Sequence, residues 1–172
     1  MFFIEDNNFL NSEQKHFIDN FLLGSNFPYF LNYNIDHQHS YLVHTFMIAP
    51  EDRKKDQPEF NSKISPIFVK LLDNFCKNNK LTYKKILRCA LNLTFPQKVK
   101  KSEPHLDHNY EHKTLLIYLN DNDGDTVILD KKNKIWKKVK PKKYKGVCFP
   151  YRYHYQFYPK SGIRAVAVYT FI

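Results

Sequence analysis

Residues 85–172 form a series of short apolar segments separated by turn-forming residues, and this pattern constrains the fold more than any other feature. The clearest segment, Lys84–Phe95, alternates with a period of two, the period of side chains along a β-strand. One face carries Leu87, Cys89, Leu91, Leu93 and Phe95, and the other carries Arg88, Ala90, Asn92 and Thr94. We therefore expect this segment to be the first strand of the core.

Further segments of the same kind follow it along the chain. They are the motif His105-Leu-Asp107 and residues 114–120, 126–129, 135–138, 146–149, 154–157 and 163–171. The turns between them contain Gly124, Asn133, Pro141 and Gly162, which are residue types that favour tight turns. A succession of about eight short strands is typical of a double-sheet jelly roll.

The first half of the chain predicts two helices and a buried strand. Ser12 is a candidate N-cap for a helix that ends before Gly24, and a second amphipathic helix follows Pro66. Residues 41–48 are an apolar run typical of a buried strand, whereas the charged residues 51–59 predict a loop.

These elements predict a single α+β domain spanning residues 1–172. Residues 1–84 would supply two N-terminal helices packed on one sheet of a jelly-roll core formed by residues 85–172. No apolar run approaches the ~20 residues that a membrane helix needs, and the first residues lack the features of a signal peptide. We expect a cytoplasmic protein, in the host cytoplasm if it is viral, with its three cysteines reduced and no membrane partner. The sequence leaves the oligomeric state open.

The net charge of +10 is concentrated in one lysine-rich segment, residues 131–145, which contains nine lysines. Without those nine lysines the net charge is +1 (10 − 9). A basic patch of this kind can bind nucleic acid through its phosphates. A solvated basic hairpin is the simpler interpretation, and we favour it.

Two imidazoles and one carboxylate predict a metal centre. Alternate residues of a strand face the same side, so His105 and Asp107 can present their side chains to one ion. His154 is placed to supply a third ligand from a distant strand. This ligand set leaves positions open for co-substrate and O₂, as in non-haem Fe(II) oxygenases. Arg164 follows ten residues after His154 and would hold an anionic co-substrate, because guanidinium is a permanently charged bidentate donor.

A second ligand arrangement uses the neighbouring histidines. His108 and His112 are four residues apart, the spacing of a helical metal pair, and could act together with Asp107. The strand-like pattern around them makes a helix here the less favoured alternative.

The order of these motifs resembles the Fe(II)- and 2-oxoglutarate-dependent dioxygenases, and most closely the prolyl-4-hydroxylase-like branch found in many phage genomes. The resemblance covers roughly residues 85–172. It is carried by Pro104-His-Leu-Asp-His108, Tyr118-Leu-Asn120, Gly124-Asp-Thr126, Gly146-Val-Cys-Phe149, His154 and Ser161-Gly-Ile-Arg164.

The resemblance implies a double-stranded β-helix in which His105, Asp107 and His154 bind Fe(II). It implies further that Arg164 pairs with the far carboxylate of 2-oxoglutarate and that Tyr118 donates its hydroxyl to the same carboxylate. O₂ would be the second co-substrate.

Four further positions bear on co-substrate binding. Thr114 lies four residues before Tyr118, on the same face of the predicted strand, and is a further candidate contact. Many relatives carry Ser or Thr two residues after the arginine, but this chain has Val166. Where prolyl hydroxylases often have tyrosines on the strand before the His-x-Asp motif, this chain has Leu91-Asn-Leu-Thr94. Asn92 and Arg88, on the polar face of that strand, are candidates to contact the co-substrate or the substrate instead.

Three function hypotheses follow. The first is a hydroxylase that acts on a peptidyl substrate, such as proline, or on a small molecule and releases succinate and CO₂. The second is a nucleic-acid-modifying oxygenase that uses the basic segment 131–145; the lack of a second arginine after Arg164 disfavours it. The third is a non-catalytic jelly-roll binding protein, which the intact ligand set disfavours.

Overall fold

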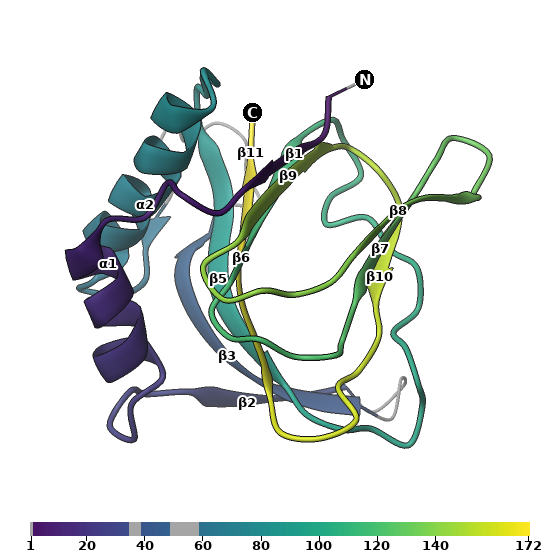
Figure 1. The fold of residues 1–172 in the computed structure, drawn as a ribbon, viewed down its shortest axis with the longest axis horizontal. Coiled ribbons are helices and arrows are strands. Elements are labelled where there is room, and N and C mark those ends of the chain that lie inside the picture. The colour runs from purple at the N-terminus through teal and green to yellow at the C-terminus, as the bar shows by residue number, and fades with distance from the viewer. Residues whose placement is uncertain (1, 35–38, 49–58) are drawn as a thin grey trace.

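The strands form two sheets in the computed structural model, which describes residues 2–34, 39–48 and 59–172 (Figure 1). The strands are β1 (Ile4–Asp6), β2 (Phe30–Asn34), β3 (His39–Ile48), β4 (Glu59–Phe60), β5 (Ile86–Thr94), β6 (Lys113–Tyr118), β7 (Thr126–Leu129), β8 (Ile135–Val139), β9 (Gly146–Pro150), β10 (His154–Gln156) and β11 (Arg164–Phe171). The helices are α1 (Ser12–Phe17), the π-helix η1 (Ile18–Leu22) and α2 (Ser65–Asn78).

The larger sheet has eight strands in the order β1-β9-β6-β11-β5-β3-β2, with β4 paired to β3. The smaller sheet has three strands in the order β10-β7-β8. Every paired strand in both sheets runs antiparallel to its neighbour. Two antiparallel sheets with helices on one side confirm the predicted α+β jelly roll. Each strand predicted after residue 113 lies within two residues of its expected bounds.

The pleat of the central strands divides the molecule into two layers. β11 lies between β5 and β6, and its odd-numbered residues join the core beneath the helices while its even-numbered residues face the smaller sheet. Ala165, Ala167, Tyr169 and Phe171 belong to the first set, and Arg164, Val166, Val168 and Thr170 to the second. The alternation predicted for β5 is confirmed for Cys89, Leu91 and Leu93, which lie in the helix-covered core. It is wrong for Leu87, because the register shifts near the start of the strand and Ile86 joins this core instead.

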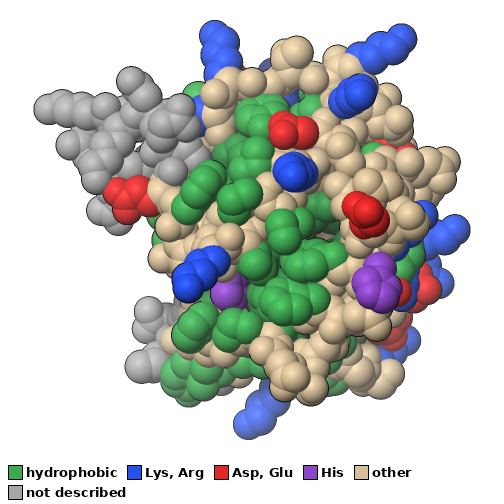
Figure 2. Space-filling view, turned by 90° about the vertical axis from the view of Figure 1, so that its left-hand side faces the viewer, with side chains coloured by type: hydrophobic (Ala, Val, Ile, Leu, Met, Phe, Trp, Pro, Cys, Tyr) green, Lys and Arg blue, Asp and Glu red, His purple; other side chains and the backbone are tan. Residues whose placement is uncertain are grey.

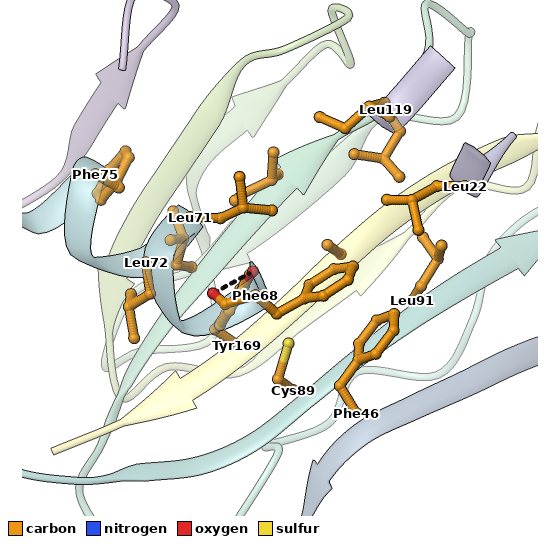
Figure 3. Close-up of a cluster of buried hydrophobic side chains, with 14 of the residues drawn as sticks. Leu22, Phe46, Phe68, Leu71, Leu72, Phe75, Cys89, Leu91, Leu119 and Tyr169 are labelled. Atoms are coloured by element: carbon orange, nitrogen blue, oxygen red, sulfur yellow. Dashed lines mark hydrogen bonds between the residues drawn. The ribbon is translucent and has the colours of Figure 1, made fainter. Parts of the chain in front are cut away.

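Helices α1, η1 and α2 cover the outer face of the larger sheet (Figure 1). Figure 3 shows that Phe68, Leu71, Leu72 and Phe75 of α2 point toward the sheet, where Tyr169 donates its hydroxyl to the carbonyl of Phe68 at 3.1 Å. Apolar side chains also remain visible on this side of the molecule, among projecting Lys and Arg side chains (Figure 2). Exposed large apolar residues of the chain include Phe21 of η1 and Phe30, Leu31 and Tyr33 of β2.

The first helix differs in detail from its prediction. Asn11, not Ser12, is the N-cap, because its side chain accepts from the backbone N–H of Gln14 at 2.9 Å while Gln14 accepts from the N–H of Asn11 at 3.0 Å. The reciprocal pair satisfies two backbone donors and so favours Asn11 over the adjacent serine. The helix continues through the π-turn η1 and ends before Gly24, as predicted.

The His-x-Asp segment is not a regular strand, so that prediction was wrong. His105 forms a single antiparallel bridge with His154, with both backbone N–H···O distances at 3.0 Å. The chain then bends, and Asp107 turns toward the larger sheet, where the hydroxyl of Thr114 donates to its carboxylate. Contacts with His154 and Thr114, and not strand alternation, therefore position the side chains of His105 and Asp107.

Three of the nine lysines in residues 131–145 form ion pairs with other described residues. Lys138 pairs with Asp125 at 3.1 Å, Lys143 with Asp19 at 2.9 Å and Lys145 with Glu5 at 3.0 Å. The last two pairs join this segment to the N-terminal elements.

The three cysteines are free and buried, as expected. Among the described residues, no helix has the length and apolar character needed to cross a membrane. Most of the predicted loop 51–59 lies outside the described residues.

Removal of the Phe68 ring tests the helix-covered core. Phe68 is fully buried and stacks on Phe46 with ring centroids 3.5 Å apart. We expect Phe68→Ala to lower the free energy of unfolding by about 3–5 kcal/mol, the usual cost of an unfilled aromatic site. Urea denaturation measures this change. Lys70→Ala, an exposed change on the same helix, should stay within about 0.5 kcal/mol of the wild type, and an equal effect of both changes would contradict the packing described here.

Candidate metal centre

A cavity of about 400 Å³ lies between the two sheets. Its lining includes Arg88, Asn92 and Thr94 of β5 and Val166 and Val168 of β11. The smaller sheet closes the opposite side with residues of β7 and β10, and the segment before β6 contributes two of the three predicted metal ligands. The volume falls in the usual range for small-molecule sites.

His105, Asp107 and His154 converge in this cavity, with one candidate ligand atom from each lying within 4.8 Å of the others. The Nδ1 atom of His105 is 3.0 Å from the carbonyl of Glu103, and that of His154 is 3.1 Å from the carbonyl of Arg152. A carbonyl can only accept a hydrogen bond, so Nδ1 is the protonated nitrogen in both rings. Each Nε2 then carries a free lone pair, as a metal ligand requires.

Asp107 is held as a carboxylate between its neighbours. Its Oδ2 atom lies 3.7 Å from His154 Nε2 and 3.9 Å from His112 Nε2, and it accepts from Thr114 at 3.0 Å. Burial raises the pKa of Asp107, but His154, His105 and Thr114 act against it, and the pKa lies below its ordinary value. Burial lowers the pKa of His154, which favours the neutral imidazole that binds metals.

Arg164 lies at another part of the cavity lining and is buried, with 4% of its surface exposed. Its Nε donates to the carbonyl of Gly124 at 2.9 Å, its Nη2 donates to Thr126 Oγ1 at 2.8 Å, and its Nη1 donates to Gln156 Oε1. All three acceptors are neutral. Within the described part of the chain Arg164 forms no ion pair, so the cavity contains a buried cation without a carboxylate partner.

Glycine is required at position 124 for this arrangement. A Cβ atom there would lie 2.7 Å from the carbonyl oxygen of Phe157 and 2.9 Å from Cδ of Arg164. Both separations are shorter than ordinary van der Waals contacts, so a side chain would push the arginine away from its acceptors.

Tyr118 lies behind the lining of the cavity. It is fully buried, its hydroxyl donates to Thr126 Oγ1 at 2.7 Å, and the Arg164 guanidinium lies 5.6 Å from its ring centroid. Burial raises its pKa, so the phenol is protonated and remains a donor. Thr126 therefore stands between Tyr118 and the space into which Arg164 faces.

The other predicted contacts lie on the same side of the larger sheet. Asn92 lines the cavity, and its Oδ1 atom is buried without a hydrogen-bond partner. Thr114 contacts the candidate metal ligand Asp107. The alternative pair does not form a site of its own, because His108 Nε2 bonds to Thr170 Oγ1 at 2.8 Å and only His112 approaches Asp107.

Sequence reasoning missed two residues of the arginine environment, Thr126 and Gln156. Both belong to the smaller sheet and reach Arg164 across the cavity. Thr126 stood in the Gly-Asp-Thr turn that carried part of the resemblance, so its position in a recognised motif was the available signal. Nothing in the local sequence marked Gln156.

No protein-family model matches the sequence, and no match was found among curated proteins. Solved structures do match. An oxidoreductase of the 2OG-Fe(II) oxygenase family from Burkholderia pseudomallei aligns with a TM-score of 0.75 and 16% identity, over 98% of this chain and 84% of that chain.

Two prolyl hydroxylases share the architecture. The viral collagen prolyl hydroxylase of Paramecium Bursaria Chlorella virus-1 aligns with a TM-score of 0.60 and 16% identity, over 99% of this chain and 89% of that one. A Trichoplax adhaerens prolyl hydroxylase in complex with a hypoxia inducible factor peptide fragment aligns with a TM-score of 0.58 and 17% identity, over 99% and 83%. The chain thus has the double-stranded β-helix fold of these enzymes, and that fold places its His-Asp-His triad and Arg164 around one cavity.

Proposed function

We propose that the protein is an Fe(II)- and 2-oxoglutarate-dependent oxygenase that hydroxylates its substrate and releases succinate and CO₂. One observation carries the proposal. A single cavity contains a His-Asp-His triad and, on another part of its lining, a buried arginine that pairs with no carboxylate of the described residues. A dicarboxylic keto acid satisfies both needs, because one end can bind a metal while the other neutralises the arginine.

The donor set fits Fe(II). Two neutral imidazole nitrogens and one carboxylate oxygen form the ligand set of non-haem Fe(II) oxygenases, which leaves positions for co-substrate and O₂. The 3.7 Å between His154 Nε2 and Asp107 Oδ2 is compatible with one shared ion, since ligand bonds of about 2.1 Å allow separations up to about 4.2 Å. The Thr114 hydroxyl and the two backbone carbonyls orient these three ligands.

When bound, iron and 2-oxoglutarate supply the oxidation, in which O₂ gives one oxygen atom to the substrate C–H bond and one to succinate as CO₂ leaves. The chain supplies binding and orientation. Arg164 holds the far carboxylate by charge and hydrogen bonding. Val166, Val168 and Leu116 give part of the lining an apolar surface, which limits the water that could compete for that carboxylate.

Thr126 completes the anion site in this proposal. Its Oγ1 atom accepts from both Tyr118 and Arg164, which uses the two lone pairs of the hydroxyl oxygen. Its hydroxyl hydrogen is then left to donate, and Thr126 lines the cavity. Tyr118, which we expected to donate directly to the carboxylate, would instead act by orienting Thr126.

A peptidyl or small-molecule substrate remains our favoured class. The similarity to a prolyl hydroxylase in complex with a peptide fragment supports a peptidyl substrate. The nucleic-acid alternative has less support, since Lys138, Lys143 and Lys145 of the basic segment already pair with carboxylates of this chain.

Replacement of a metal ligand tests the activity itself. We expect His105→Ala to reduce succinate release from Fe(II) and 2-oxoglutarate to background, because two remaining ligands bind the ion poorly. His16→Ala, a change of an exposed histidine on α1, is the matched control and should retain wild-type turnover. Wild-type turnover by His105→Ala would refute the ligand assignment.

The support of Asp107 by Thr114 can be tested by metal binding alone. Thr114→Val preserves shape but removes the hydroxyl, so we expect the Kd for Mn(II) to rise about tenfold or more, the usual effect of losing a group that orients a ligand. Calorimetric titration measures this. Thr170→Val is the control, because Thr170 lies in register with Thr114 on the neighbouring strand but its hydroxyl contacts His108 and not Asp107. Equal Kd values for Thr114→Val and the wild type would contradict the proposed support.

The role of Arg164 can be separated from that of the metal. We expect Arg164→Met to raise the Kd for 2-oxoglutarate about 10–100-fold, because a charge-assisted hydrogen bond is lost. Its Kd for Mn(II) in the absence of 2-oxoglutarate should stay near the wild-type value, which also reports an intact fold. A variant that binds 2-oxoglutarate as tightly as the wild type would show that the anion binds elsewhere.

A further inference from the structure

The cavity contains a second arginine, Arg88, to which the proposed reaction assigns no role. Arg88 lies near the start of β5 and is half-buried, with its side chain in the lining of the cavity. It faces the same side of the sheet as Asn92 and Thr94, which line the cavity too. A chemical role for Arg88 therefore concerns the same space as the metal centre.

Residues of β5 and β11 line one side of the cavity, which we call the cavity floor. Arg88 and Arg164 lie at opposite ends of this floor. Thr94 is the partner of Arg164 across the β5–β11 pair, and Arg88 is six residues further along β5, opposite Thr170. Six residues of a strand span about 20 Å. The Arg164 guanidinium is held at its own end by Gly124, Gln156 and Thr126, so an anion bound there lies far from the backbone of Arg88.

The end of the floor that carries Arg88 is also the end nearest the metal ligand Asp107. Thr170 pairs with Arg88 on one side and with Thr114 on the other, so these three residues form one row across the sheet. Thr114 donates to Asp107, which fixes the carboxylate above this row. Arg88 and Thr114 are two strands apart, about 10 Å at the usual strand spacing. A group bound by Arg88 would thus lie beside the triad and away from Arg164.

The guanidinium of Arg88 has no ion pair within the described residues, although acids are near. Asp107 interacts with it electrostatically, but the triad uses that carboxylate. Glu103 lines the same cavity and forms no ion pair in the part of the chain described. A half-buried cation beside a cavity favours an anionic ligand.

Asn92 adds a second group that can recognise a ligand on the same strand, β5. It lies four residues along β5 on the same face, and its buried Oδ1 has no hydrogen-bond partner. An unpaired buried acceptor costs free energy that a ligand N–H or O–H can recover. β5 therefore offers a cation and a hydrogen-bond acceptor at one end of the cavity floor, whereas Arg164 and Thr126 lie at the other end.

From this arrangement, and resting on the proposed function, we propose that Arg88 binds an oxyanion of the substrate. The substrate is then a small molecule or peptide residue that carries a carboxylate or phosphate close to the carbon that is hydroxylated. Asn92 accepts a hydrogen bond from a donor on the same molecule. Arg88 is thereby a specificity-determining residue.

The test compares ligands that differ only in the anion. Calorimetric titrations use the full chain loaded with Mn(II) and 2-oxoglutarate. The matched probes are L-proline and L-prolinamide, acetyl-Gly-Asp-Gly-amide and acetyl-Gly-Asn-Gly-amide, and adenosine monophosphate and adenosine. We expect the charged member of at least one pair to bind about 10–100-fold more tightly than its neutral counterpart, as a charge-assisted bond predicts. The pair that responds distinguishes a carboxylate from a phosphate.

Variants at Arg88 assign the preference to this residue. Arg88→Met should remove the difference between charged and neutral probes, Arg88→Lys should keep part of it, and Lys100→Met, which removes an exposed charge from the nearby loop, should keep all of it. The Kd of Arg88→Met for 2-oxoglutarate serves as the check of its fold.

Three results would overturn this proposal. They are a panel in which no charged probe binds more tightly than its neutral partner, an undiminished preference in Arg88→Met, or a loss of 2-oxoglutarate binding in both Arg88 variants. Failure of the wild type to bind 2-oxoglutarate is a separate outcome that would contradict the proposed function instead.

Discussion

The pleat of β5, β6 and β11 is the constraint on which the rest of the structure depends. Each of these strands is buried on both faces, with one set of side chains beneath the helices and the alternate set toward the cavity. A shift of one residue in register would exchange the two sets. The apolar packing of α2 against Leu91, Leu115 and Tyr169 therefore also fixes the direction in which Arg164 and Thr114 project.

The buried positive charge of Arg164 determines which ligands the cavity favours. A buried guanidinium is costly unless it is paired and hydrogen-bonded. Across residues 2–34, 39–48 and 59–172, Arg164 has three neutral acceptors but no carboxylate partner. In the proposed function, an anionic co-substrate supplies the missing negative charge when it binds. Val166, at the position where many members of the resembled family carry Ser or Thr, is fully buried and lines the cavity. Thr126 from the opposite sheet accepts a hydrogen bond from Arg164. In the proposed site, Thr126 thus supplies from the opposite sheet the hydroxyl that position 166 lacks.

The sequence predicted the strands of residues 113–172 because short apolar segments alternate with turn-forming residues there. It predicted the triad because its residue types are diagnostic together. It could not predict contacts that depend on how two sheets face one another. Gln156 and Thr126 reach Arg164 only across the cavity, and the bridge between His105 and His154 replaces the strand we expected. The row that joins Arg88 to Thr114 depends on strand order, which alternation alone does not specify.

The most direct test of the central claim is the coupling between metal and co-substrate. Calorimetry would compare the Kd values of 2-oxoglutarate and of glutarate, which lacks the keto oxygen, with and without Mn(II). If the triad and Arg164 form one site, Mn(II) should tighten 2-oxoglutarate binding about tenfold or more and glutarate binding less. Equal affinity of 2-oxoglutarate with and without the metal would contradict the account.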